Sequence, residues 1–475
     1  MIARVLTDEQ IGRIHAASLT ILERIGIVVP HEEVLSRFAD AGAEVERELL
    51  RVRIPPDLAM RLLNQAGKQF TIYGRDLLRK AAFGYGQRNY NSSAGQAMWV
   101  DHPGAARRYS TLQDVVTGSR LGDALDRINI VGAMADPHEV PVGYRCVEVM
   151  AAMLRNTTKP ITFFFHNRTS ARYLTEMTIA VRGSLEAAKE YPLCYPLFEP
   201  ISPLRFPFHG VDLLFETARL NLPVHVGPMA QMGLSAPATV AGTMAQENAE
   251  ILAGICVTQL ISPGMPVCYG GICHAFDMAT TQTIFGGPEQ AIFSVAMAQM
   301  GKSYGLPVYI NAGLTDSKRP DAQAGLESGI TLALGAAAGA DIFGHLGIAG
   351  ADQGSSPDIL VLQEEIVSYV ESALRQIDFS DEALGIAEIE AAGPGGTFID
   401  REHTVNHFRR ELWFPRLLDR DFYQAWLDNG AATMEERCRH RKEELLGTHT
   451  PEPIPKDLDR ALNEIVAEAK KELTT

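Results

Sequence analysis

The stretch PVYINAGLTDSKRPDAQAG, residues 307–325, begins as an apolar run typical of a buried strand and ends in small, polar and charged residues. Similar runs, rich in β-branched or aromatic residues, recur along the chain and alternate with longer helical patterns. They are INIVGAMAD near 128, KPITFFF near 159, YPLCYPLFEP near 191, LPVHVGPMA near 222, MPVCYGGICHAF near 265, LPVYINAG near 306 and ADIFGHLGIAG near 340. The spacing of roughly 30–45 residues suits a strand, a helix and their loops.

Strands that are apolar throughout and joined by helices predict a parallel sheet that is buried on both faces. With an eighth strand or its helix from DILVLQEEIVSYV at 358–370, the seven runs predict an α/β fold that closes into a (β/α)8 TIM-type barrel. An open doubly wound sheet is the rival fold. It is disfavoured because no strand-to-helix turn carries G-x-G-x-x-G, and GPGGTF at 393–398 lies outside the alternation.

The barrel core is expected to span residues 121–380, between two further sections. Residues 1–120 are expected to be a helical and irregular section that packs on the barrel, because TDEQIGRIHAASLTILERIGI and HEEVLSRFADAGAEV both show helical spacing of apolar residues. Residues 381–475 are richer in aromatic residues and charge, and they are expected to form a helical C-terminal cap that could serve as a docking surface.

Composition argues against several classes of partner. The 58 acidic residues outnumber the 43 basic ones and give a formal charge of −15, which disfavours nucleic acid. The acidic N-terminus lacks the apolar core of a signal peptide, and six scattered cysteines without a C-x-x-C pair fit a reducing compartment, so a cytoplasmic protein is expected. Residues 251–276 carry no charge, but SPG at 262–264 interrupts them, so no membrane span is expected.

Candidate site residues follow from the carboxyl ends of the strands, where barrels carry their reacting groups. The runs end at Asp136 and His138; Phe163, Phe165 and His166; Glu199; Met229 and Gln231; Gly271 and His274; Asn311, Gly313 and Leu314; and His345. Glu199 is notable because a carboxylate at an apolar strand end is unfavourable unless it is paired or solvated. His345 lies between glycines that allow a ligand to approach, although a core histidine bonded to a carbonyl is the simpler interpretation.

Two groups of residues raise the question of a metal. Cys268, Cys273 and His274 lie near one strand end, but their spacing matches no common zinc motif. His403 and His407 could share a helix face, yet H-E-x-x-H is missing. We therefore expect no metal site.

Four long stretches of the sequence resemble the trimethylamine methyltransferase family, whose members are corrinoid-dependent enzymes with a (β/α)8 barrel. They are ILERIGIVVPHEEVLSRFADAGAEVE, GPMAQMGLSAPATVAGTMAQENAEILAGICVTQLISPGMPV, AGLTDSKRPDAQAG and GPGGTFIDREHTVNHFRRELWFPRLLDR. The resemblance covers roughly residues 5–440. Founding members of the family carry pyrrolysine at the bottom of the barrel cavity, and the resemblance places that position within Asn311–Leu314, at Gly313 or Leu314, where this sequence has ordinary residues.

Non-pyrrolysine relatives are associated with quaternary amines such as glycine betaine, proline betaine and carnitine. They pass the methyl group to cobalt on a separate small corrinoid protein. The resemblance thus implies a quaternary amine methyltransferase with glycine betaine as the leading substrate. It also implies that cobalamin is presented by the partner protein and that no cofactor is tightly bound to this chain.

The absence of pyrrolysine is consistent with the chemistry of such a substrate. A quaternary ammonium that loses a methyl cation to Co(I) leaves as a neutral tertiary amine, which needs no proton, so the enzyme can lack a general acid. What remains is alignment, with the reacting atoms about 3–3.5 Å apart. The cavity at Asn311, Gly313 and Leu314 is expected to leave room for the substrate and the incoming cobalt.

The substrate's two charges predict two kinds of contact. Aromatic faces would hold the trimethylammonium group by cation–π attraction of about 0.5–2 kcal/mol each, and an acid such as Glu199 would add Coulomb attraction. The candidate aromatic residues are Tyr90, Phe163, Phe165, Phe198 and Phe343. The candidate donors to a betaine carboxylate are His345, His166, Asn311 and Asn91.

Three alternatives remain open at this point. The chain could act on another betaine, it could be a zinc-dependent corrinoid methyltransferase, or it could be a barrel that binds betaines without catalysis. A homo-oligomer is also expected, although the sequence fixes no stoichiometry.

Overall fold

A curled six-stranded parallel sheet forms the centre of the molecule in the computed structural model, which describes residues 3–474. The strand order is β11-β12-β14-β17-β18-β6, and every neighbouring pair is parallel. The strands are β6 (Asn89–Ser92), β11 (Leu197–Phe198), β12 (Val224–Val226), β14 (Val267–Gly271), β17 (Val308–Asn311) and β18 (Ile342–Leu346). The parallel order brings the carboxyl ends of all six strands to one edge of the sheet.

A second parallel pair, β9 (Val131–Gly132) and β10 (Ile161–Thr162), lies beside both ends of this sheet. The Ile130 N–H donates to the Tyr90 carbonyl of β6 at 3.2 Å. On the other side, the Ile161 N–H donates to the Leu193 carbonyl, just before β11, at 3.1 Å. The pair is therefore hydrogen-bonded to the segments at the two edges of the six-stranded sheet.

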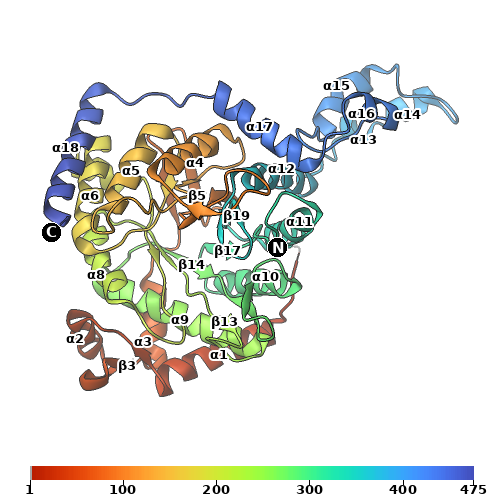
Figure 1. The fold of residues 1–475 in the computed structure, drawn as a ribbon. Coiled ribbons are helices and arrows are strands. Elements are labelled where there is room, and N and C mark those ends of the chain that lie inside the picture. The colour runs from red at the N-terminus through yellow and green to blue at the C-terminus, as the bar shows by residue number, and fades with distance from the viewer. Residues whose placement is uncertain (1–2, 475) are drawn as a thin grey trace.

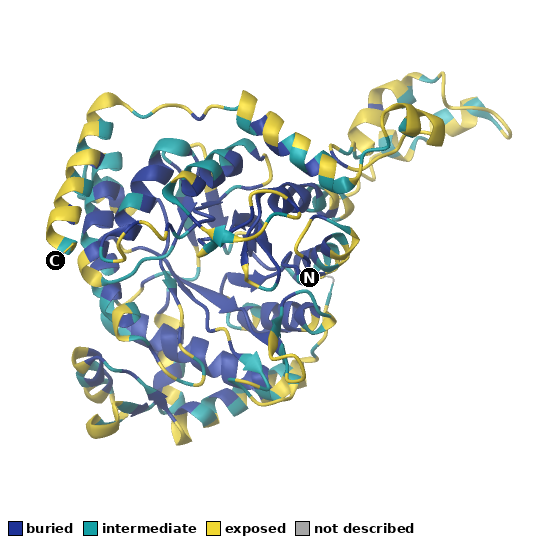
Figure 2. Cartoon of the chain, viewed as in Figure 1, coloured by how far each residue is buried: buried dark blue, intermediate teal, exposed yellow. Residues whose placement is uncertain are grey.

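A ring of helices surrounds these strands (Figure 1). The helices are α4 (Leu112–Ala124), α5 (Arg145–Asn156), α6 (Arg168–Arg182), α8 (Phe208–Thr217), α9 (Val240–Ile261), α10 (Pro288–Ser303), α11 (Ala322–Ala338) and α12 (Pro357–Ala373). The buried side chains lie between the strands and this ring, where Figure 2 is dark blue. The fold is thus an α/β arrangement of parallel strands and covering helices.

All seven apolar runs of the sequence contain a strand of this parallel set, so these predictions are confirmed. DILVLQEEIVSYV at 358–370 lies in helix α12 and is not a strand. The eighth strand is instead β6, whose sequence NYNS is polar. Hydrogen bonds offset the burial of Asn89 in this strand: its side chain donates to the carbonyls of Ala82 and Asp341 at 2.8 and 3.0 Å.

The N-terminal residues cover one side of the ring. They contain α1 (Asp8–Arg24), α2 (Glu32–Ala41), α3 (Pro56–Gln65), the antiparallel sheet of β1 (Ile27–Val28), β3 (Arg51–Arg53) and β2 (Glu44–Glu46), and the hairpin of β4 (Phe70–Tyr73) and β5 (Lys80–Phe83). Helices α1, α2 and α3 pack on α9. The expected boundary at residue 120 does not coincide with a change of fold, because β6 pairs with β18 and α4 runs across the boundary.

The C-terminal residues form three separate parts rather than one cap. The short helices α13 (Asp381–Leu384), α14 (Ile386–Ala392), α15 (Glu402–Glu411) and α16 (Tyr423–Asp428) project from the body (Figure 1). Helix α17 (Met434–Thr448) then packs on α12 and α4, and α18 (Lys456–Leu473) packs on α6 and α5. Within residues 3–474, every helix is too short or too polar to cross a membrane.

A buried lysine, Lys159, holds the turn between helix α4 and strand β9. The Lys159 ammonium donates to the carbonyls of Gly122, Leu125 and Ile128 at 3.0, 2.7 and 2.7 Å, where α4 ends. Burial lowers the pKa of Lys159 to about 8. Three carbonyls that would otherwise be unsatisfied in the interior are thereby paired.

We expect Lys159→Met to lower the free energy of unfolding by about 2–4 kcal/mol, because it leaves three buried carbonyls without a donor. Urea denaturation followed by circular dichroism measures this change. The exposed Lys189 on α7 (Leu185–Glu190) gives the matched control, and Lys189→Met should alter the stability little. Equal stability of the two variants would contradict the structural role of Lys159.

Candidate active site

A small cavity of about 110 Å³ lies at the carboxyl ends of the parallel strands. Its lining residues are Gln96, Phe164, Glu199, Met229, Ile272, Phe285, Asn311, Leu314, His345, Ile348 and Asp352. Seven of the eight parallel strands contribute a residue at or just beyond their ends; β9 does not. This is the edge at which α/β barrels carry their active sites.

Asn311, the last residue of β17, brings an amide to the cavity. Its Nδ2 donates to Nε2 of His274 at 3.1 Å, and its Oδ1 has no hydrogen-bond partner among residues 3–474. Burial lowers the pKa of His274 to about 3, so the imidazole is neutral. His274, the first residue of β15 (His274–Asp277), thus holds the Asn311 amide in one orientation and leaves its oxygen free.

His345 interrupts the regular pairing of β18. Its φ of 43° is left-handed, and the register with β6 shifts between Phe343 and Leu346. The Ala94 N–H donates to its Nδ1 at 3.4 Å, so the proton of the neutral ring is on Nε2. Burial lowers the pKa of His345 to about 4. The ring is therefore neutral near pH 7 and carries an N–H donor on the nitrogen that Ala94 leaves free.

Two carboxylates line the same cavity. Glu199 follows β11 directly and accepts no hydrogen bond from residues 3–474, whereas Asp352 accepts one from Nε2 of Gln96 at 2.7 Å. Both side chains are open to solvent in the cavity but otherwise enclosed by protein. This burial, together with the charge of Asp352, raises the pKa of Glu199 to about 7, and burial raises the pKa of Asp352 to about 6.

The loop that carries Asp352 is held in a strained conformation. Residues 350–352 have φ values of 63°, 54° and 64°, and for the non-glycine residues Ala351 and Asp352 this conformation is unfavourable. The N–H groups of Gly350 and Ala351 donate to the carbonyls of Ser317 and Thr315 at 2.8 and 3.3 Å. The polar residues after β17 thus hold the backbone that presents Asp352.

Asp316, from the same stretch, positions an aromatic wall. Its carboxylate accepts hydrogen bonds from the N–H groups of Phe285 and Gly286 at 2.9 and 3.1 Å. Phe285 lines the cavity and stacks on His274 with ring centroids 4.2 Å apart. The polar end of the strand at 307–325 therefore acts as a scaffold for the site.

Four of the predicted site residues line the cavity, namely Asn311, Leu314, His345 and Glu199. Met229, which was noted as a strand end, also lines it. Gly313 does not: its φ is 92°, and a Cβ there would lie 2.5 Å from a methyl carbon of Leu346. Its carbonyl accepts a hydrogen bond from Ser328 of α11 at 2.7 Å, so Gly313 anchors the strand end to that helix.

The five predicted aromatic residues lie outside the cavity. Tyr90 stacks on Phe343 at 4.9 Å, and its hydroxyl bonds Glu371 of α12. Phe163 and Phe165 contact each other at 5.0 Å, and Phe198 contacts Phe206 at 5.4 Å. The intervening Phe164 lines the cavity instead, one position away from each of the two predicted residues.

Two predicted donors also lie elsewhere. The Nδ1 of His166 is 3.2 Å from the Val142 carbonyl, and its Nε2 is 4.0 Å from the Asp136 carboxylate. Both ring nitrogens therefore face residues 136–142 and not the cavity. Asn91 is buried inside the sheet beside Tyr309. Neither residue lines the cavity.

Six lining residues were absent from the sequence-based candidates: Gln96, Phe164, Ile272, Phe285, Ile348 and Asp352. Phe164 and Ile272 directly adjoin predicted candidates, so strand-end position was a usable signal for them. Asp352 and Phe285 are brought in by loops, and only tertiary hydrogen bonds place them.

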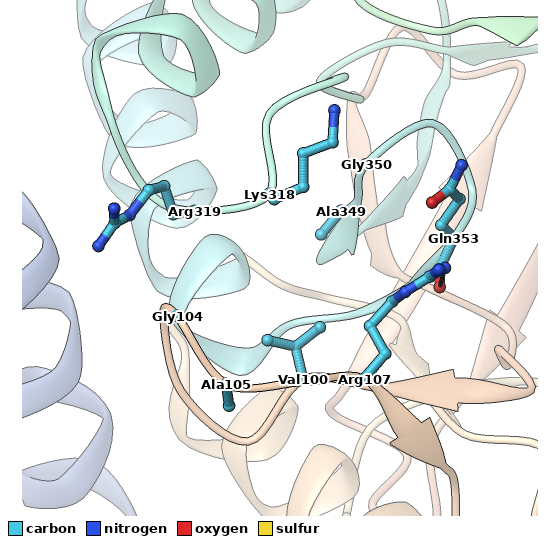
Figure 3. A pocket seen from close by; sticks show the side chains of 9 residues that line it. All are labelled: Val100, Gly104, Ala105, Arg107, Lys318, Arg319, Ala349, Gly350 and Gln353. Carbon is cyan, nitrogen blue, oxygen red and sulfur yellow. Dashed lines mark hydrogen bonds between the residues drawn. The ribbon is translucent and has the colours of Figure 1, made fainter. Parts of the chain in front are cut away.

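A second hollow of about 390 Å³ is shown in Figure 3. The segment 348–353 contributes residues both to this hollow and to the cavity. Ile348 and Asp352 face the cavity, whereas Ala349, Gly350 and Gln353 line the hollow. The hollow contains the exposed cations Arg107, Lys318 and Arg319. Among the described residues, the cavity lining therefore holds two acids and no Lys or Arg, whereas these three cations line the hollow.

Residues 3–474 contain no group of three or more His, Cys, Asp or Glu side chains placed to hold a metal ion. Cys268, Cys273 and His274, which the sequence brings close together, are all buried and make no such group. His403 and His407 stack on each other in the projecting C-terminal part, with ring centroids 4.2 Å apart.

Sequence comparison identifies related proteins over the whole chain. The chain is 30% identical over 471 residues to the glycine betaine methyltransferase of Desulfitobacterium hafniense (strain Y51), an alignment that covers 99% of this chain and 98% of that protein. It is 29% identical over 469 residues to the trimethylamine methyltransferase MttB of Desulfitobacterium hafniense (strain DSM 10664 / DCB-2), covering 98% and 94%. Both relatives are methyltransferases.

Solved structures show a similar fold at low sequence identity. The hydroxylamine complex of MtmB matches with a TM-score of 0.53 and 7% identity, over 99% of this chain and 88% of that one. The monomethylamine methyltransferase MtmB of Methanosarcina barkeri matches with a TM-score of 0.50 and 8% identity, over 100% and 95%. These likenesses concern the fold alone.

The model of the family described as trimethylamine methyltransferase (MTTB) matches residues 2–474. Together with the relatives, this match covers nearly the entire chain. The chain is therefore a methyltransferase that belongs to the trimethylamine methyltransferase (MTTB) family.

Proposed function

We propose that this methyltransferase moves a methyl group from a quaternary amine, with glycine betaine as the leading substrate, to the Co(I) of a corrinoid on a separate protein. The Co(I) electron pair forms the new bond to carbon, and the electron pair of the broken C–N bond stays on nitrogen. The leaving tertiary amine is neutral and takes up no proton during the step.

The observation that carries this proposal is the pairing of Glu199 with Asp352 in a cavity whose lining includes no Lys or Arg. Burial and the charge of Asp352 raise the pKa of Glu199 to about 7, and burial raises the pKa of Asp352 to about 6. A quaternary ammonium ion between them would relieve both effects. The faces of Phe164 and Phe285 add an aromatic wall suited to methylated nitrogen.

His345 suits the other end of a betaine, because the neutral ring carries a proton on Nε2 that can be donated to a carboxylate. The Asn311 amide nitrogen already donates to His274, so its part is to shape the strand end. Neither His345 nor His274 is protonated near pH 7, since burial lowers the pKa values to about 4 and about 3. These residues support binding and orientation rather than acid catalysis, which agrees with a leaving group that needs no proton.

The size of the cavity favours the smallest betaine. A volume of about 110 Å³ suits a small ligand. Carnitine and proline betaine, the alternative substrates, carry a longer chain and a ring. Glycine betaine needs the least rearrangement of the lining.

The strand order supports a closed (β/α)8 barrel. The hydrogen bonds from Ile130 to Tyr90 and from Ile161 to Leu193 join the pair β9 and β10 to both edges of the six-stranded sheet. In such a barrel, Leu314 is the better equivalent of the pyrrolysine position, because it lines the cavity whereas Gly313 has no room for a side chain. The barrel then begins at β6, ahead of residue 121.

The partner in this proposal supplies the corrinoid, and this chain supplies the binding site for the amine. The Glu199 and Asp352 carboxylates hold the ammonium group, and the strand-end residues align its methyl group. A zinc-dependent mechanism would need ligands that residues 3–474 do not group together.

We expect the purified protein to methylate Co(I) cobalamin from glycine betaine, with dimethylglycine as the co-product. The absorbance change of cobalamin follows the methyl transfer, and proline betaine, carnitine and trimethylamine complete the panel. Glu199→Gln should lower kcat/KM by at least about tenfold, because it removes one of the two charges that attract the substrate. Methyl transfer from trimethylamine but from no quaternary amine would contradict the proposed substrate class, and betaine binding without methyl transfer would contradict the enzymatic role.

Binding of tetramethylammonium, which does not titrate, should strengthen by about tenfold between pH 5 and pH 8. The sign follows from the carboxyl groups: below their pKa values of about 6 and about 7 both are neutral, and above them both attract the cation. Isothermal titration calorimetry across this range measures the effect.

Substitutions separate the contributions of Glu199 and Asp352 to this pH dependence. Glu199→Gln should remove much of the rise in affinity near pH 7, and Asp352→Asn much of the rise near pH 6, with some coupling between them. Glu186→Gln, on the exposed surface of α7, is the matched control and should keep the full pH dependence. A flat profile in the unmodified protein would count against the carboxylate pair as the ammonium site.

A further inference from the structure

Helix α9 carries two buried glutamates, Glu247 and Glu250, on the face that it turns to the strands. The helix packs against β12, β13 (Gln231–Met232) and β14 (Figure 1). Both side chains are fully buried, and their spacing of three residues places them on one side of the helix. Among residues 3–474, neither forms an ion pair with a Lys or Arg. A carboxyl group in the core without a cation is unfavourable unless hydrogen bonds satisfy it.

The Glu247 carboxyl group joins the ends of two neighbouring parallel strands. Its Oε2 accepts the Ala230 N–H, four residues beyond β12, at 3.0 Å, and its Oε1 accepts the Ile272 N–H, directly after β14, at 2.9 Å. Burial and the charge of Glu250 raise the pKa of Glu247, whereas these N–H donors favour the ionised form. Both oxygens act as acceptors, which is the arrangement of an ionised carboxylate.

The peptide groups that Glu247 holds belong to the wall of the cavity. Ile272 lines the cavity itself, and Ala230 directly follows the lining residue Met229. A backbone N–H can only donate, so a carboxylate with two acceptor oxygens is suited to fixing both strand ends at once. Glu247 therefore controls the backbone on which two lining side chains stand.

A third lining residue depends on the same contact. The Ala230 carbonyl accepts the His274 N–H at 3.0 Å, and the His274 ring accepts the Asn311 amide at 3.1 Å. The orientation of Asn311 at the end of β17 is thus connected to Glu247 through Ala230 and His274. Displacement of Ala230 would reach the cavity from two sides.

Glu250 makes comparable contacts with the loop that follows Glu199. Its Oε1 accepts the Leu204 N–H at 2.8 Å, and its Oε2 accepts the Ser202 hydroxyl at 2.6 Å. One face of α9 therefore holds the segments that follow β11, β12 and β14.

We propose that Glu247 is a positioning residue for methyl transfer, which acts through the N–H groups of Ala230 and Ile272 to fix the wall of the cavity. Its carboxyl group lies behind the wall, so it contacts no substrate. The placement of the wall is independent of the identity of the substrate, and only the kinetic test below rests on the proposed function.

Hydrogen exchange measured by mass spectrometry tests the first step. In Glu247→Gln the side chain keeps its size but has one acceptor oxygen and one NH₂ group, which cannot pair with an N–H. One of the two strand ends should therefore lose its acceptor, and the peptide that contains Ala230 or Ile272 should exchange at least about tenfold faster. Unchanged exchange in both peptides would overturn the proposal.

Gln259→Met on the same helix is the matched control. Gln259 is also buried, and it accepts the Gly264 N–H and donates to the Met265 carbonyl, both at 2.9 Å, ahead of β14 at the opposite end of the strand. This variant loses two buried hydrogen bonds, so its melting temperature should fall, but exchange at Ala230 and Ile272 should not change. Faster exchange at those two residues in Gln259→Met would indicate general loosening of α9 and contradict a specific role of Glu247.

The kinetics of methyl transfer from glycine betaine to Co(I) cobalamin separate positioning from stability. Glu247→Gln should lower kcat/KM by up to about 100-fold, with a loss in kcat as well as in KM, because misalignment of the substrate affects the transfer step itself. Gln259→Met should keep both constants at a comparable loss of melting temperature. Faster exchange in Glu247→Gln with unchanged kcat and KM would show that the contact serves stability alone and would overturn the proposal.

Two further measurements keep the test decisive. If Glu247→Gln does not fold, Glu247→Asp takes its place, because it keeps two acceptor oxygens but is one methylene too short to reach both strand ends. If the unmodified protein transfers no methyl group from any quaternary amine, the proposed function fails, and a crystal structure of the variant decides the role of Glu247. Met229 and Ile272 should then be displaced relative to the unmodified protein, and unmoved side chains would contradict the proposal.

Discussion

The placement of two carboxylates, Glu199 and Asp352, in the lining of one small and largely apolar cavity is the constraint on which the site depends. Enclosed carboxylates without a paired cation are unfavourable, and their raised pKa values reflect this. Arg107 and Lys318 line the neighbouring hollow, and Arg319 beside them is paired with Glu435 at 2.7 Å, so none of these cations neutralises the acids of the cavity. This separation of charge leaves the cavity suited to a small cation from outside.

The strand ends and their loops maintain that arrangement. Glu199 and Asn311 need only their strands, because each lies at the end of one. Asp352 depends on Thr315 and Ser317, whose carbonyls hold the left-handed segment 350–352, and Phe285 depends on the carboxylate of Asp316. The polar residues after β17 therefore hold the loops that carry Asp352 and Phe285 in place.

The sequence predicted what depends on local pattern and failed where tertiary contacts decide. Seven strands were predictable because apolar runs in a parallel sheet are distinctive, whereas β6 was not, since Asn89, Tyr90 and Asn91 look like a loop until their hydrogen bonds are known. Glu199, Asn311, Leu314 and His345 could be named from strand ends. The aromatic wall could not be predicted, because a shift of one residue along the strand places Phe164 instead of Phe163 in the cavity. Phe285 and Asp352 could not be predicted either, because both lie on loops.

A crystal structure of the protein grown with glycine betaine tests the central claim most directly. The account predicts electron density for the trimethylammonium group in the cavity, with its nitrogen within about 4–6 Å of both the Glu199 and the Asp352 carboxylates. Density for the ligand beside Arg107 and Lys318 with the cavity unchanged, or a metal ion coordinated by Glu199 and Asp352, would contradict it.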